Sequence, residues 1–179
     1  MNNKWNSFLK ELSELYFFWF FGVVFFTIFR LAFITIFHKQ IQNFAFSDFV
    51  KVLFMGFRFD CTVVAYFLLL PFLALLILTY FGHFKIIKKM RKTFQILFLF
   101  SSTIISLVTL NYFAEYNNQF NHFLFLGLYD DQKAVLNTIL KDYHPILNFT
   151  MFLLVILIGI LILNFFDKRE NTYAILKKI

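Results

Sequence analysis

Four long apolar runs constrain this chain more than any other feature of its sequence. They cover residues 15–37, 61–81, 94–113 and 146–166. A helix needs about 20 apolar residues to cross the ~30 Å hydrocarbon core of a bilayer. With 60% hydrophobic and 15% charged residues, the chain is too apolar for a soluble domain, in which charged residues reach about 25%. The sequence therefore predicts an all-α integral membrane protein with four transmembrane helices.

The first run, residues 15–37, is predicted to be an uncleaved helix. It is longer than the apolar region of a signal peptide, and no Ala-x-Ala cleavage site follows it. Arg30 is its one charged residue and lies about two helical turns before the end of the run. Its long side chain can reach the headgroups, or it can face the helix bundle if it has a partner such as Asp60 or Glu115. Both interpretations of Arg30 stay open.

The segment before the second run is predicted to form a short helix in the membrane interface. Ser47 can cap this helix, Asp48 suits its positive end, and an apolar face follows at helical spacing. An ordinary short helix within a loop explains the same pattern equally well. The segment leads into Gly56-Phe57-Arg58-Phe59-Asp60, which places two charges at the mouth of the second run.

A group of polar residues predicts a binding site for a lipid headgroup. Charges near lipid are costly, so Arg58 and Asp60 suggest a site, although Arg58 can also snorkel while Asp60 caps the following helix. Glu115 and Asn118 follow the third run and are expected on the same membrane face. Arginine binds phosphate bidentately, and carboxylates and amides orient hydroxyl groups. An ordinary solvated loop is the alternative interpretation.

The basic residues predict the orientation of the chain. Residues 82–93 hold five basic residues and no acid, as in a short cytoplasmic loop. If both termini are cytoplasmic, eleven Lys and Arg residues lie on that face and five on the other. Residues 114–144 then form an extracytoplasmic loop, part of which is predicted to be an amphipathic helix. A net charge of +7 distributed in this way does not indicate a nucleic-acid partner.

Patterns for catalysis, metals and cofactors are missing from the sequence. Cys61 is the one cysteine, and the four histidines have no ligand spacing. There is no Gly-rich phosphate loop, no Gly-x-Ser-x-Gly motif and no zinc-protease helix motif. We therefore predict no catalytic residue, no metal ligand and no cofactor in this chain.

Three segments carry a resemblance to a known family. They are Phe54-Met55-Gly56-Phe57-Arg58-Phe59-Asp60 followed by an apolar span with Leu70-Pro71, then Asn111-Tyr112-Phe113-Ala114-Glu115-Tyr116-Asn117-Asn118-Gln119-Phe120-Asn121, and residues 129–145. Together they cover most of the chain from about position 50 to 166. These segments resemble the membrane half of the lipoteichoic acid synthase-like family of phosphoglycerol transferases.

The resemblance implies a larger enzyme. Such enzymes add a further membrane helix and an extracytoplasmic sulfatase-fold domain with a Thr nucleophile and a divalent metal. That domain moves phosphoglycerol from a lipid donor to a glycolipid or glycan. The 179 residues here offer no position for that nucleophile or for the metal ligands.

The resemblance therefore leads us to expect the membrane anchor or lipid-substrate domain of such an enzyme, inactive by itself. Its place is the bacterial cytoplasmic membrane, and its partners are membrane lipids and a separate or missing sulfatase-fold catalytic domain. The alternative is a noncatalytic membrane scaffold or lipid-binding subunit.

Overall fold

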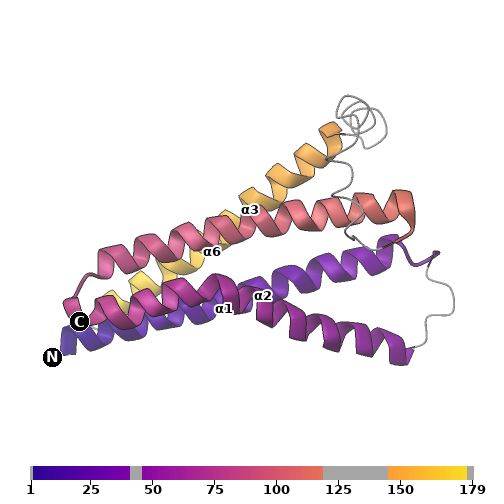
Figure 1. Ribbon diagram of the computed structural model, residues 1–179. Helices are drawn as coiled ribbons and strands as arrows, with labels where there is room; N and C mark the ends of the chain where they lie inside the picture. Colours follow the sequence, from indigo (N-terminus) through magenta and orange to yellow (C-terminus); the bar gives the residue numbers. More distant parts are fainter. Residues whose placement is uncertain (1, 41–45, 119–144, 177–179) are drawn as a thin grey trace, which may run out of the picture. The chain divides into compact units, whose positions relative to one another are not determined.

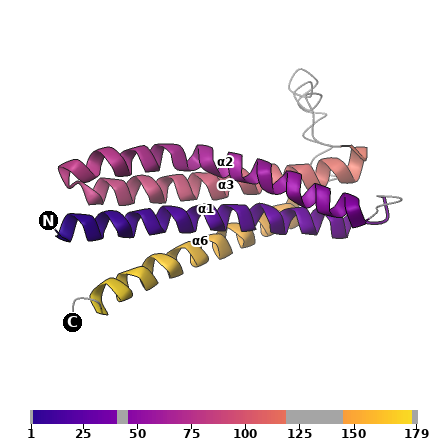
Figure 2. The same ribbon diagram turned by 90° about the horizontal axis from the view of Figure 1, so that it is seen from below.

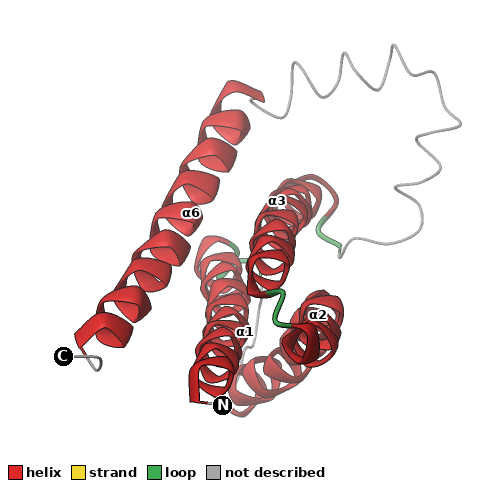
Figure 3. Cartoon of the chain, turned by 90° about the vertical axis from the view of Figure 1, so that its left-hand side faces the viewer, coloured by secondary structure: helices red, strands yellow, loops and turns green. Residues whose placement is uncertain are grey.

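The structure, a computed structural model, describes residues 2–40, 46–118 and 145–176, and all its regular elements there are α-helices (Figure 3). They are α1 (Asn2–Ile36), α2 (Phe46–Phe81), α3 (Phe84–Tyr116) and α6 (Pro145–Leu176). All four are long and apolar enough to cross a membrane. The prediction of an all-α, multi-pass membrane protein is confirmed for the part of the chain that the structure describes.

The helices are longer than the apolar runs that predicted them. They contain 35, 36, 33 and 32 residues, so each is about 48–54 Å long at a rise of ~1.5 Å per residue. The short helix expected before the second span begins near the predicted place and continues into α2, because its one glycine, Gly56, is tolerated inside a helix. Asp60 therefore lies inside α2 and does not cap it. The helix expected within residues 119–144 lies outside the described residues.

The chain divides into two compact units. The first unit consists of residues 1–99 and 160–179, and the second of residues 100–159, so α3 and α6 contribute to both. In the first unit, α1 and α2 run antiparallel and in contact, with the first half of α3 beside them (Figures 1 and 2). The first turns of α2 diverge from the end of α1 (Figure 1), and no residue from Phe46 to Met55 is buried.

Close helix packing in the first unit depends on one glycine and one phenylalanine. A Cβ atom on Gly22 of α1 would lie 2.7 Å from Cγ2 of Val64 on α2 and 3.2 Å from Cζ of Phe98 on α3. Phe98 is fully buried. Four rings surround it at centroid distances of 5.3 to 5.9 Å, from Phe18, Phe25, Phe26 and Phe67. Gly22 therefore allows α1 to approach α2 and α3 closely, and the aromatic rings around Phe98 fill the space between the helices.

The connection between α2 and α3 is a tight turn at Gly82 and His83. The amide of Gly82 donates to the carbonyl of Thr79 at 3.1 Å, and the amide of His83 donates to the carbonyl of Leu78 at 3.1 Å. These are the two hydrogen bonds of a Schellman motif, and Gly82 has the positive φ of 77° that the motif requires. The loop expected over residues 82–93 is therefore confined to this turn, and its basic residues lie in the first turns of α3.

The second unit joins the second half of α3 to the first half of α6. Asn111 and Asn148 exchange side-chain amide hydrogen bonds of 3.0 and 3.2 Å. The rings of Phe100 and Phe152 meet edge to face, with centroids 5.4 Å apart. A reciprocal amide pair between two apolar helices fixes their rotation, because each amide satisfies the other within lipid.

Candidate functional site

The principal polar feature of the α1–α2 pair is a two-pronged ion pair between Arg30 and Asp60. Nη2 of Arg30 lies 2.8 Å from Oδ1 of Asp60, and Nη1 donates to Oδ2 at 2.9 Å. Only 6% of Asp60 is exposed. Of the two interpretations left open for Arg30, the structure supports the one in which it faces the bundle. The pair satisfies both charges within an apolar region, where either alone would be costly.

Gly56 makes room for this ion pair. It lies one turn before Asp60 on α2, and a Cβ atom built on it would overlap the guanidinium of Arg30. The i and i+4 positions share a helix face. Gly56 therefore leaves the space for the Arg30 side chain, and Asp60 supplies the carboxylate that accepts its hydrogen bonds. The sequence had singled out this glycine only as part of a motif, because its partner lies on another helix.

Arg58 faces away from Asp60. Residues two apart on a helix point in different directions, and Arg58 is exposed whereas Asp60 is buried. Arg58 forms no ion pair with any described residue, and its carbonyl accepts the hydroxyl of Thr62 at 3.0 Å. Arg58 and Asp60, which the sequence analysis grouped together, therefore have different environments. Asp60 holds α1 and α2 together, and Arg58 remains available at the surface.

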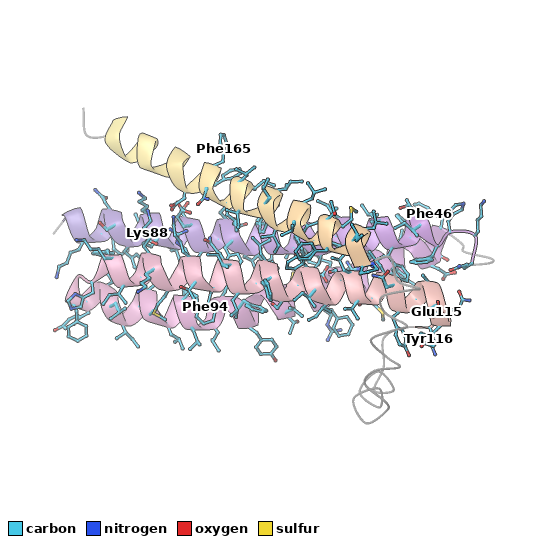
Figure 4. The ribbon with its side chains drawn as sticks, turned by 90° about the horizontal axis from the view of Figure 1, so that it is seen from above. Phe46, Lys88, Phe94, Glu115, Tyr116 and Phe165 are labelled. Carbon is cyan, nitrogen blue, oxygen red and sulfur yellow. The ribbon has the colours of Figure 1, made fainter. Side chains whose placement is uncertain are left out.

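The other two predicted site residues belong to the second unit. Glu115 lies in the last turn of α3 beside Tyr116, as Figure 4 shows, and its side chain is exposed. Asn118 is also exposed, and it follows Asn117, which has a positive φ of 48° just after α3 ends at Tyr116. Arg58 and Asp60, in contrast, belong to the first unit.

A cluster of charges at the start of α3 was missed by the sequence reasoning. Arg91 is 1% exposed, and its guanidinium contacts three carboxylates on two other helices. Nε lies 3.1 Å from Glu11, Nη1 lies 3.2 Å from Glu14, and Nη2 lies 3.0 Å from Asp167. The cluster therefore joins α1, α3 and α6 within the first unit.

Two lysines complete this cluster around the second oxygen of Asp167. Lys92 lies 2.9 Å and Lys88 3.3 Å from Oδ2. With Arg91, Glu11 and Glu14, the cluster holds three basic and three acidic side chains, so its formal charges cancel. Two features of the sequence were a signal for this cluster. Glu11 and Glu14 are three residues apart, and Asp167 directly follows the fourth apolar run. Those acids are compatible with solvated helix ends, so only the fold assigns them to Arg91.

An apolar groove runs along the contact between α1 and α2. One part has a volume of about 690 Å³ and the adjoining part about 580 Å³. The two parts share Trp19, Ala65 and Leu69. No charged residue lines either part, and the lining includes the polar residues Ser13, Tyr16 and Thr62. The groove can therefore accept hydrocarbon.

Within the described ranges, no three His, Cys, Asp or Glu side chains gather in a way that could hold a metal ion. No family model, no curated protein and no solved structure matches this chain.

Proposed function

We propose that this chain is a lipid-binding membrane domain that presents a phosphoglycerol lipid to a sulfatase-fold transferase domain. The proposal combines the resemblance of the motif around Arg58 with the physical role of that motif. Gly56 and Asp60 are occupied by Arg30, so they hold α2 in place. Arg58 is left exposed between them in sequence, without an ion-pair partner among the described residues. This free cation is the observation that carries the proposal.

The depth of Arg58 supports a headgroup as its ligand. It lies 23 residues before Phe81 at the end of α2, a distance of about 35 Å along a helix. The hydrocarbon core is about 30 Å thick. If the turn after Phe81 lies at one face of the membrane, Arg58 is at the level of the phosphates on the other face.

The contacts of Arg91 support a common side for the two ends of the chain. They bring the first part of α1, the start of α3 and the last part of α6 together. Lys4 also reaches the carbonyl of Tyr80 at the end of α2, at 3.4 Å. The excess of lysine in the first turns of α3 favours the cytoplasmic side of a bacterial plasma membrane. We therefore also propose that both termini lie on the cytoplasmic side.

A labelling experiment tests the transferase part of the proposal. Cells that encode this chain are given tritiated glycerol, and label is followed from membrane phosphoglycerol lipid into envelope glycolipid or polymer. Deleting the gene should slow this transfer, the wild-type gene should restore it, and R58Q should not. K89Q changes an exposed charge in α3 by the same amount and should restore it. Unchanged transfer after deletion would contradict the proposal.

The second candidate is a noncatalytic scaffold or lipid-binding subunit. It is favoured by the cluster around Arg91, in which a buried guanidinium joins three helices, as suits a structural role. In this case deletion would leave glycerol transfer unchanged, while anionic lipid would still be retained by the purified chain.

A further inference from the structure

The groove between α1 and α2 has the length of one lipid leaflet. Its lining on α2 extends from Cys61 to Phe72, and its lining on α1 from Leu9 to Trp19. These stretches are about 15–17 Å long at the helical rise. Half of a ~30 Å hydrocarbon core is about 15 Å. A single extended acyl chain from one leaflet therefore fits the groove in length.

Arg58 stands on the same face of α2 as the groove. Thr62, Ala65, Leu69 and Phe72 line the groove at spacings of three and four residues. Arg58 precedes Thr62 by four residues, so it continues this stripe by one turn. Helical side chains lean toward the N-terminus, which directs Arg58 away from the hydrocarbon and toward the headgroups.

We propose that this groove binds one acyl chain of an anionic phospholipid whose phosphate is held by Arg58. This inference rests on the proposed function, because it names the place where the lipid is bound. The uncharged lining suits a hydrocarbon chain, and the unpaired guanidinium suits a phosphate. Tyr16 and Tyr66 line the groove from opposite helices, and 69% and 72% of their surfaces are exposed. Both side chains therefore remain accessible to a bound chain.

A helix of a partner is a poorer fit than a lipid. A helix seated between α1 and α2 would have to accept the charge of Arg58 at one end of an uncharged groove. It would need an acid at that depth and small residues facing Trp19 and Tyr66. A phospholipid provides the flexible apolar tail and the anion in one molecule, so charge complementarity favours the lipid.

Fluorescence quenching by brominated lipids tests the inference. Trp5 and Trp19 are the two tryptophans of the chain, and Trp19 lines both parts of the groove. The variant W5F leaves Trp19 as the one tryptophan. It is reconstituted in nanodiscs containing phosphatidylglycerol or phosphatidylcholine with bromine on the acyl chains. Quenching measures the access of each lipid to the groove.

We expect brominated phosphatidylglycerol to quench Trp19 at about one fifth of the concentration of brominated phosphatidylcholine. One arginine near anionic lipid contributes about 1 kcal/mol, which corresponds to about a fivefold preference. In the W5F background, R58Q should remove this preference and K89Q should keep it. A65F fills the groove at an exposed position and should reduce quenching by both lipids.

Three results would overturn the inference. Equal quenching by the two lipids would mean that the groove is ordinary lipid-facing surface. Preference that survives R58Q would remove Arg58 from the site. Absence of quenching by either lipid, with the chain dimeric in nanodiscs, would identify the groove as a contact between two copies. The quenching assay measures lipid binding and does not depend on glycerol transfer. A negative labelling experiment would therefore contradict the transferase proposal without contradicting this inference.

Discussion

The guanidinium of Arg30 occupies the space that a side chain on residue 56 would fill. Gly56 is therefore needed for its size, and Asp60 is needed for its charge. The ion pair is largely buried, with 20% of the Arg30 side chain and 8% of the Asp60 side chain exposed. Buried pairs contribute little net stability compared with apolar residues, but removal of one partner leaves an uncompensated charge.

Asp60→Asn should lower the free energy of unfolding in detergent micelles by about 3 kcal/mol, because Arg30 loses its counter-charge in an apolar region. The double variant Arg30→Leu with Asp60→Leu should recover most of that loss. Asp48→Asn is the matched control on the same helix, since Asp48 pairs with Lys51 at the surface, and it should change stability by less than about 1 kcal/mol. Equal effects of the two Asn substitutions would contradict this account.

Arg91→Met should destabilise the chain by about 3–5 kcal/mol, since it leaves the carboxylates of Glu11, Glu14 and Asp167 crowded together without their shared cation. Lys89→Met, at an exposed position two residues earlier, controls for loss of charge in α3. Thermal unfolding in micelles, followed by circular dichroism, measures both variants. A transition for Arg91→Met that coincides with that of Lys89→Met would show that the cluster does not hold the helices together.

The residues of the candidate site were only partly predictable. Composition and position identified Arg58 and Asp60 as costly charges near lipid, because that argument needs no partner. Their division into an exposed arginine and a buried aspartate depends on Arg30, which is 30 residues away from Asp60 in the sequence. Arg91 was interpreted as an orientation signal for the same reason, since its three acids come from the beginning and the end of the chain.

At the level of the helices, Gly22 sets how closely α1 approaches its neighbours. A methyl group there would meet Val64 at 2.7 Å and Phe98 at 3.2 Å. Both neighbours are fully buried, so neither can easily move aside. The apolar run containing Gly22 predicts a span, but it does not predict which face of the span is the tight one.

Gly22→Ala should lower the free energy of unfolding by about 1–3 kcal/mol through overpacking. In combination with Val64→Ala, which removes the two nearest methyl groups, the effects should be smaller than additive. Val63→Ala on the neighbouring position, 39% exposed, should not couple to Gly22→Ala. Strict additivity for the pair with Val64 would contradict the close contact.

Element boundaries were less predictable than element types. Apolarity marks the part of a helix within hydrocarbon, whereas the helix itself continues into polar sequence when nothing stops it. Thus α3 begins at Phe84, ten residues before the predicted span. Gly82 stops α2 because its positive φ allows the carbonyls of the last turn to be satisfied. Asp60 does not start a helix, since the residues before it are helical as well.

At the scale of the whole molecule, charge is placed at two depths along α1. Glu14 contacts Arg91, and Arg30 contacts Asp60, 16 residues later. That separation is about 24 Å along the helix, which is comparable with the ~30 Å of a hydrocarbon core. Between these depths the first unit packs with aromatic and aliphatic side chains. On the outer surface of α6, Phe165 projects with 62% of its surface exposed (Figure 4), as suits a side chain facing lipid.

The measurement that tests the central claim most directly is the lipid retained by the purified chain. The protein is reconstituted in nanodiscs that contain equal amounts of phosphatidylglycerol and phosphatidylcholine. It is then released from them, and the masses of the intact protein and its lipid complexes are measured by native mass spectrometry. The account predicts a population carrying phosphatidylglycerol that persists as collision energy rises and exceeds the phosphatidylcholine-bound population by about fivefold. Release of bare protein would contradict a lipid-binding function, and equal retention of the two lipids would contradict the binding of an anionic headgroup by Arg58.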